Sequence, residues 1–246
     1  RLLTEDRLRS SYAARNLGIR NARGTLIAFI DSDCVAETGW LSAAVRRMLD
    51  SGADVVGGNV VFDYVGRPSG AQLFDSITNM QVERNVRERG VAKTANLLAR
   101  ATTFGSVGLF PSTMTSGGDV AWTARASRAG HDLVYAPDAR VHHPARDLRE
   151  LVRKQYRVGR GQPSAWMRRG LSRRGFARLS LRTLTTRPSP ARIRGELQRR
   201  GVTASRTDVL RAWLAGLLAG IAAVAGMVRS VPTLTGRRPA QEVVPS

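Results

Sequence analysis

Apolar residues follow two different spacings along the first 161 residues of the chain. Apolar positions three or four residues apart predict helices, and short apolar runs bounded by turn residues predict strands. Such alternation of helices and strands is typical of α/β proteins. The helices are expected over residues 10–22, 40–49, 71–88, 120–128 and 148–156, and the strands over 26–30, 53–62, 94–100, 133–136 and 140–143.

The strand over residues 53–62 contains Gly57 and Gly58. Glycine weakens a strand but lets it bend or lets another segment approach closely. We therefore expect one of these two features at this point of the sheet.

The strand over residues 26–30 ends at two carboxylates, Asp31 and Asp33. A short apolar run that follows a helix stop is expected to be buried on both faces, as in a parallel sheet. Open α/β sheets bind ligands at the carboxyl ends of their strands. Two carboxylates at such an end can hold a divalent cation, and the cation can hold phosphate oxygens. The alternative is an ordinary solvated turn.

A second acidic position, Asp119, follows Gly117 and Gly118 at the start of a predicted helix. An aspartate in this place is also a common helix cap. The glycines favour a ligand site, because they leave space for a ligand to approach. The α/β pattern between Asp33 and Asp119 is long enough to bring both to one edge of the sheet.

The formal net charge of +20 is concentrated in the last part of the chain. Residues 1–150 contain 19 Lys and Arg against 16 Asp and Glu, whereas residues 151–246 contain 20 against 3. A basic block of this kind indicates anionic lipid headgroups, nucleic acid or an anionic substrate as its partner. Few aromatic residues are interleaved with these arginines, which disfavours nucleic acid because base stacking needs aromatic side chains. The single cysteine, Cys34, excludes an internal disulfide and fits a reducing compartment.

Residues 212–228 carry no charge. At ~1.5 Å per residue, a helix of this length spans roughly 25 Å, which is the short end for a membrane crossing. Gly216 and Gly220 form a pair of small residues suited to helix packing. Arginines on both sides favour a membrane helix, spanning or interfacial, over a buried one. We expect a domain over residues 1–161, a basic linker or helical region over 162–207, a membrane-associated helix over 208–230 and a flexible tail over 231–246.

Several short segments agree, in order, with one known family. They are residues 14–19 (Ala-Arg-Asn-Leu-Gly-Ile), 22–24 (Ala-Arg-Gly), 27–33, 94–97 (Thr-Ala-Asn-Leu), 117–119 with Arg125 and Gly130, 141–144 (Val-His-His-Pro) and 156–161 (Tyr-Arg-Val-Gly-Arg-Gly). As an ordered set they resemble the inverting glycosyltransferases of family 2, which have the GT-A fold. The resemblance covers residues 8–161 and implies a Rossmann-like, mostly parallel sheet with helices on both faces.

The resemblance lacks one part of the family pattern. The N-terminal strand, the first βαβ unit and its acidic residue, which grip the nucleoside, have no counterpart here. The chain begins at Arg1, without a Met or a secretory signal. We therefore expect an N-terminally truncated GT-A domain followed by a helical, basic C-terminal tail.

The resemblance also implies a reaction, the transfer of a sugar from a nucleoside-diphosphate sugar to an acceptor hydroxyl with inversion. It implies a Mg²⁺ or Mn²⁺ cofactor and assigns a role to each matching residue. Asp119 is the expected catalytic base; Asp31, Asp33 and His143 are the expected metal ligands; Arg15, Asn16, Asp31, Arg157 and Arg160 are expected to contact the donor diphosphate; and Asn96, Gly117, Gly118 and Trp122 the acceptor. The position of Trp122 also fits the core, and an ordinary strand histidine is the alternative for His143.

The expected partners follow from the family and the charge. They are a nucleoside-diphosphate sugar, a glycan or lipid-linked acceptor and an anionic membrane surface, with no nucleic acid. Residues 155–157 (Gln-Tyr-Arg) differ from the Gln-x-x-Arg-Trp pattern of processive members, which favours a single transfer. The expected location is the cytoplasmic face of the cell membrane.

Two other interpretations remain open at this point. Residues 31–35 (Asp-Ser-Asp-Cys-Val) also fit the first motif of haloacid-dehalogenase-like phosphotransferases, in which the first aspartate is the nucleophile. Those enzymes need a later second acid, where this chain has Thr123. The other interpretation is an inactive basic fragment at a membrane surface.

Overall fold

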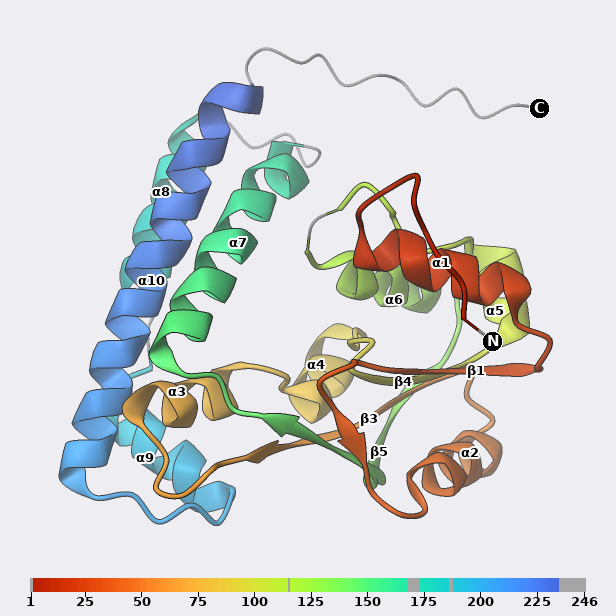
Figure 1. Cartoon of the computed structure of the whole chain (residues 1–246), viewed down its shortest axis with the longest axis horizontal. Helices are drawn as coiled ribbons and strands as arrows, with labels where there is room; N and C mark the ends of the chain where they lie inside the picture. The colour runs from red at the N-terminus through yellow and green to blue at the C-terminus, as the bar shows by residue number, and fades with distance from the viewer. Residues whose placement is uncertain (1, 115, 168–172, 186–187, 235–246) are drawn as a thin grey trace. The chain divides into compact units, whose positions relative to one another are not determined.

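The protein forms two compact units in a computed structural model (Figure 1). The structure describes residues 2–114, 116–167, 173–185 and 188–234. The first unit consists of residues 1–68 and 75–145, and the second of residues 69–74 and the chain from residue 146 onward. The boundary expected near residue 162 falls inside a helix, α7 (Leu148–Met167).

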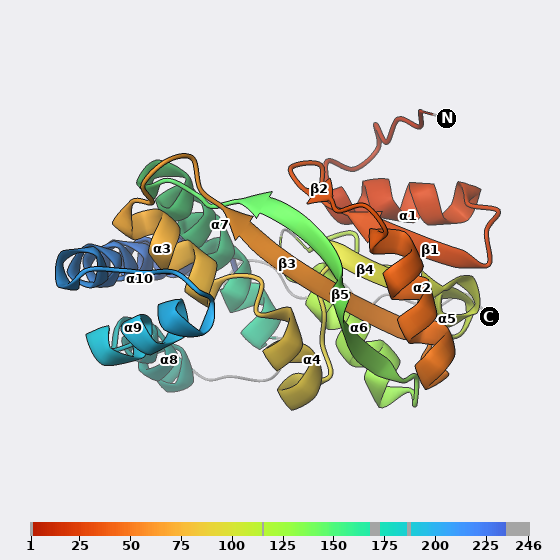
Figure 2. The same cartoon turned by 90° about the horizontal axis from the view of Figure 1, so that it is seen from below.

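A five-stranded mixed sheet forms the centre of the first unit (Figure 2). The strands lie in the order β1-β4-β3-β5-β2, and of the neighbouring pairs in this sheet β3 and β5 are parallel and the other three are antiparallel. The prediction of a mostly parallel sheet is therefore wrong, because an apolar run shows that a strand is buried and not in which direction it runs. The strands are β1 (Leu26–Ile30), β2 (Val35–Ala36), β3 (Val55–Asp63), β4 (Asn96–Arg100) and β5 (Leu133–Pro144).

β1 is the terminal strand of this sheet, and it is more exposed than expected. Only Phe29 of β1 is buried, and Ile30 is 39% exposed. The central strands β3 and β4 are the ones buried on both faces. Apolar composition alone did not distinguish an edge strand from a central one.

The expected bend in β3 occurs between Gly58 and Asn59, where the register with β5 shifts. A Cβ atom at Gly58 would overlap the side chain of Asn96, and one at Gly57 would lie 3.0 Å from Val82. The two glycines thus allow both the bend and the close approach of neighbouring side chains.

Helices cover both faces of the sheet, as predicted (Figure 1). On one face, Tyr12, Val86, Phe104 and Trp122 belong to the same apolar cluster as Leu97. On the other face, Met48 packs with Val56 and Leu98. The helices of the first cluster are α1 (Ser11–Asn21), α4 (Val82–Arg89), α5 (Ala101–Val107) and α6 (Gly118–Arg128), and that of the second is α2 (Trp40–Ser51).

The single helix expected over residues 71–88 is two helices, α3 (Gly70–Thr78) and α4. The chain breaks at Met80, which has a positive φ of 48°. A non-glycine residue in this conformation is rare and interrupts the helical path. The apolar spacing continues through the break, so the pattern did not reveal it.

The second unit is built of helices, with α7 and α10 (Arg206–Leu234) lying side by side (Figure 1). A Cβ atom at Gly159 would overlap the carbonyl of Ala223, and one at Gly226 would overlap that of Tyr156. Gly216 instead faces the ring of Phe74 on α3. Small residues thus set the close packing of α10, as expected, although Gly226 was not singled out. The other helices are α8 (Arg173–Thr185) and α9 (Pro190–Arg199).

Candidate active site

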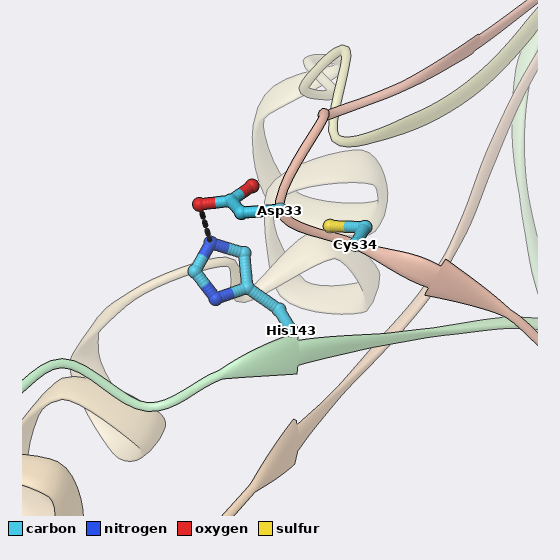
Figure 3. Close-up of side chains that lie close together, drawn as sticks. All are labelled: Asp33, Cys34 and His143. Carbon is cyan, nitrogen blue, oxygen red and sulfur yellow. Dashed lines mark ion pairs between the residues drawn. The ribbon is translucent and has the colours of Figure 1, made fainter.

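Asp33 and His143 come together from the turn after β1 and the end of β5 (Figure 3). His143 Nε2 lies 3.5 Å from Asp33 Oδ2, and the His143 side chain is only 1% exposed. Its other nitrogen, Nδ1, lies 2.7 Å from the carbonyl oxygen of Pro144. Because a carbonyl only accepts, Nδ1 carries the proton, and in the neutral ring Nε2 presents a lone pair toward the carboxylate.

This arrangement fits a divalent cation. A neutral His143 presents a lone pair to the Asp33 carboxylate, and a cation between the two relieves their repulsion, whereas a protonated ring would form an ion pair with Asp33 directly. A carbonyl that fixes the far nitrogen of the ring is the usual support of a metal-ligating histidine. Ligand atoms of Asp33, His143 and Cys34 lie within 4.8 Å of one another. Cys34 also packs against the apolar cluster of the first unit, which sets it apart from Asp33 and His143.

Asp31 is paired with Arg15 of α1. Arg15 Nη2 lies 2.6 Å from Asp31 Oδ1. Burial raises the pKa of the Asp31 carboxyl, against the lowering effect of Arg15. Asp33 and Asp119 raise this pKa further and His143 lowers it, so all three act on Asp31 across one site. Among the described residues, Asp31 does not join the group around His143 that could hold a metal.

Asp119 lies in the first turn of α6, as expected from its glycine-rich approach. Gly117 precedes the helix with a φ of 78°, a conformation that favours glycine. The Tyr12 hydroxyl donates to Asp119 Oδ1 at 3.3 Å, and the Thr94 N–H donates to Oδ2 at 3.4 Å. The helix N-terminus adds a favourable field for a carboxylate. Both carboxyl oxygens of Asp119 are thus oriented by hydrogen bonds.

Tyr12 is a site residue that the sequence alone did not reveal. Burial first, and then the charge of Asp119, raise the pKa of Tyr12 to about 12. Its ring fills the space beside Gly118, where a Cβ atom would lie 2.8 Å from it. Tyr12 and Arg15 are three residues apart and therefore share one face of α1. This spacing was the one feature of the sequence that could have linked Tyr12 to the site, but it also fits an ordinary core position.

Three residues expected to bind substrates are structural instead. Asn16 is 4% exposed and is bonded to both the N–H and the carbonyl of Phe110, at 3.0 and 2.8 Å. Asn96 is 2% exposed; it accepts from Trp40 Nε1 at 2.7 Å and donates to the carbonyls of Asn59 and Ala139 at 2.8 and 2.7 Å. Buried amides need such partners, because an unbonded one is costly.

Trp122 is the third of these residues. It is fully buried, its ring stacks on Phe104 at 4.4 Å, and its Nε1 donates to the Gly108 carbonyl at 2.6 Å. The core position is therefore correct and the acceptor contact is wrong.

Other predicted contacts stay predictions. Arg157 and Arg160 lie exposed on α7, in the second unit. Gly117 and Gly118 have the backbone and packing roles described above, and no contact to an acceptor tests them. His142, next to His143, lies between two carboxylates: its Nε2 is 2.8 Å from Glu37 Oε1, and its Nδ1 is 2.7 Å from Asp63 Oδ1. The sequence did not predict these two contacts.

Comparisons with known proteins agree on one family. The family described as "Glycosyl transferase family 2" matches residues 1–102. The chain is 40% identical over 235 residues to glycosyltransferase AglE of Haloferax volcanii, across 93% of the chain and 77% of that protein. It is 32% identical over 161 residues to a pre-mycofactocin glycosyltransferase of Mycobacterium tuberculosis, across 62% of the chain and 34% of that protein.

A solved structure has a similar fold. The mannosyltransferase PcManGT of Pyrobaculum calidifontis, in complex with GDP-Man and Mn²⁺, superposes with a TM-score of 0.58 and 17% identity, across 94% of this chain and 69% of that one. These matches do not support the expected loss of an N-terminal unit. They also exclude the phosphotransferase interpretation, and Thr123, where that interpretation needs an acid, is fully buried. The chain belongs to the family 2 glycosyltransferases and is a glycosyltransferase with an α/β fold of the GT-A type.

Proposed function

We propose that this enzyme transfers a sugar from a nucleoside-diphosphate sugar to an acceptor hydroxyl, with inversion, using Mg²⁺ or Mn²⁺. The observation that carries the proposal is the Asp33–His143 pair, whose facing atoms lie 3.5 Å apart. Both residues and Asp119 act electrostatically on Asp31. The PcManGT structure, which contains GDP-Man and Mn²⁺, supports a donor of this class.

Asp33 and His143 are the residues that would hold the cation. The Pro144 carbonyl keeps the proton on Nδ1 of His143, so that Nε2 is available as a ligand. When bound, the cation offsets the negative charge that develops on the departing diphosphate. Asp31 belongs to the same end of the site, where Arg15 neutralises it.

Asp119 is the proposed base. It must be ionised and come within about 3 Å of the attacking hydroxyl. The hydrogen bonds from Tyr12 and Thr94 stabilise its anion and orient it. No other nucleophile is required, because the acceptor hydroxyl attacks the sugar directly and the configuration therefore inverts. Positioning and electrostatics supply the rate enhancement in such a step.

The diphosphate has further proposed contacts. Arg15 lies beside Asp31 and supplies positive charge next to the proposed metal site. Arg157 and Arg160 are also proposed as phosphate contacts, since a guanidinium suits phosphate geometry. The acceptor is proposed to approach Gly117 and Gly118, on the same segment as Asp119.

The acceptor is proposed to be a lipid-linked or cell-surface glycan precursor, reached from the cytoplasmic face of the membrane. The basic composition after residue 150 supports an anionic membrane partner. α10 is the one apolar helix among the described residues that is long enough to cross a membrane, although half of its apolar window is buried.

Calorimetric titration of GDP and UDP, with Mn²⁺ or with EDTA, tests the site. We expect metal-dependent binding by the wild type that is lost in Asp33→Ala and retained in Asp50→Ala, a change at an exposed aspartate on α2. Circular dichroism would confirm that each variant is folded. Equal metal-dependent binding by wild type and Asp33→Ala would overturn the metal assignment. No binding by the folded wild type would count against a nucleotide site in this chain.

A further inference from the structure

The distribution of small and large residues between the two faces of α10 is the opposite of that in a water-soluble helix. Between Val209 and Met227, which are buried near its two ends, its buried face carries small residues, among them Ala212, Ala219 and Ala223. Its outer face carries large apolar residues, which we call the α10 stripe: Leu210, Leu214, Leu218, Ile221 and Val228, each 45–56% exposed. Water-soluble helices bury their large apolar side chains and expose polar ones.

The small residues are explained by packing within the second unit. Gly226 and Ala223 lie against the backbone of α7. The large residues are spaced four, four, three and seven positions apart, so they form one continuous line along the helix. Exposed apolar patches of this kind mark interaction surfaces.

Positive charges stand at both ends of the α10 stripe. Arg206 and Arg211 lie at one end and Arg229 at the other, all exposed, with no charge between residues 212 and 228. Beside the first end is a cavity of about 460 Å³ between α9 and α10. Its walls include the apolar residues Pro190, Val209 and Leu210 and the arginines Arg194 and Arg206.

The cavity combines two chemistries that occur together in one class of ligand. Guanidinium groups suit phosphate oxygens, and the adjacent apolar wall suits a hydrocarbon chain. The wall is continuous with the α10 stripe, because Leu210 belongs to both. A phospholipid likewise has a phosphate group next to hydrocarbon chains.

We propose that the α10 stripe lies in the interface of an anionic phospholipid bilayer, parallel to its surface, with Arg194 and Arg206 contacting headgroup phosphates. The helix does not cross the bilayer alone, because its other face is covered by α7 and its neighbours in the second unit. The stripe enters the acyl region, and the flanking arginines remain at the phosphate level. This inference deepens the membrane association proposed above and names the surface responsible.

Vesicle sedimentation of the full chain tests this surface. The test variant combines Leu214→Ser, Leu218→Ser and Ile221→Ser. The control variant combines Leu49→Ser and Leu181→Ser, which are exposed leucines on α2 and α8. We expect the stripe variant to lose binding to phosphatidylglycerol-containing vesicles and the control to bind as the wild type does. Unchanged binding by the stripe variant would overturn the proposal.

The two arginines have a separate readout. The double variant Arg194→Gln and Arg206→Gln should bind phosphatidylglycerol vesicles about 5-fold more weakly per arginine, since a basic residue near an anionic surface contributes about 1 kcal/mol. Its binding to pure phosphatidylcholine should change less, because the phosphate of that headgroup is neutralised by its own choline cation, and inorganic phosphate should not compete. An equal loss on both vesicle types would count against the preference for an anionic headgroup.

The orientation and the alternative occupant are measurable with spin labels and light scattering. With Cys34 replaced by Ser, labels placed in turn at positions 214, 218 and 228 should report similar depths if α10 lies in the interface. A maximum depth at 218 would mean that α10 spans, and would overturn the interfacial orientation. A wild-type dimer that the stripe variant converts to a monomer would assign the stripe to a second copy instead.

Nucleotide binding separates this inference from the proposed function. The stripe variant should retain the Mn²⁺-dependent nucleotide binding of the wild type, which also shows that it is folded. If neither the wild type nor any variant binds nucleotide, while the wild type still binds vesicles, only the proposed chemistry is overturned. The reverse result would overturn only the membrane surface.

Discussion

The Tyr12 hydroxyl donates to Asp119 Oδ1 at 3.3 Å, although 107 positions separate the two residues along the chain. Tyr12 is three residues before Arg15, which is paired with Asp31. One face of α1 therefore contacts both the proposed base and the acidic turn at the proposed metal site. Because its pKa is about 12, the Tyr12 hydroxyl stays protonated at neutral pH and remains a donor to Asp119.

Tyr12→Phe should lower kcat for sugar transfer by about tenfold, with little change in KM for the donor. The substitution removes one hydrogen bond that orients and stabilises the Asp119 anion but keeps the ring beside Gly118. Tyr64→Phe is the matched control, and a kcat for Tyr12→Phe equal to that control would contradict the positioning role.

Asp119→Asn should retain metal-dependent nucleotide binding but lose transfer by roughly 10²–10⁴-fold, the usual contribution of a general base. The amide has nearly the same shape and cannot take the acceptor proton. Single-turnover kinetics with saturating donor would measure this loss directly. Transfer at wild-type rates would remove Asp119 from the chemistry.

The adjacent histidines should behave differently toward Mn²⁺. His143→Asn removes the nitrogen that faces Asp33, so the affinity for Mn²⁺ should fall at least about tenfold. His142→Asn should leave it unchanged, because His142 is already engaged by Glu37 and Asp63. Electron paramagnetic resonance of free Mn²⁺ measures both constants. Equal affinities in the two variants would refute the choice of His143.

His142 should make stability depend on pH. Hydrogen bonds to Asp63 and Glu37 raise the pKa of His142 above its usual value. Its stabilising contribution is therefore fully present below the unfolded-state pKa of about 6.5 and is lost as the pH rises through the folded-state pKa. The difference in denaturation midpoint between wild type and His142→Asn should shrink from pH 5.5 to pH 9. A difference that is constant with pH would contradict this prediction.

Asn96→Ala should destabilise the fold by about 2–4 kcal/mol, because it leaves the Trp40 N–H and the carbonyls of Asn59 and Ala139 without the partner that Asn96 now provides. Urea denaturation measures this change. The KM for the acceptor should be unaffected in the fraction that remains folded. A stable variant with a raised acceptor KM would restore the binding role first expected for Asn96.

The pattern of apolar and polar residues determined much of this protein by itself. It placed most helices and strands of the first unit, the bend at Gly57 and Gly58, the core position of Trp122 and the uncharged segment of α10. These features depend on local spacing and on the transfer of apolar surface out of water, both of which can be read along the chain. The acidic turn and Asp119 were also visible, because glycines and carboxylates stand out against an apolar background.

Only the tertiary structure decided which of these residues act together. Strand direction, the edge position of β1 and the break at Met80 depend on partners distant in sequence. Asn16 and Asn96 resembled ligand-binding residues but bond the backbone, since a buried amide takes the nearest partners that the fold brings to it. The same long-range packing set His143 against Asp33, Tyr12 against Asp119, and the small face of α10 against α7, leaving its large residues outside. Spacing along the chain does not encode such contacts, because they form only when separate elements pack on one another.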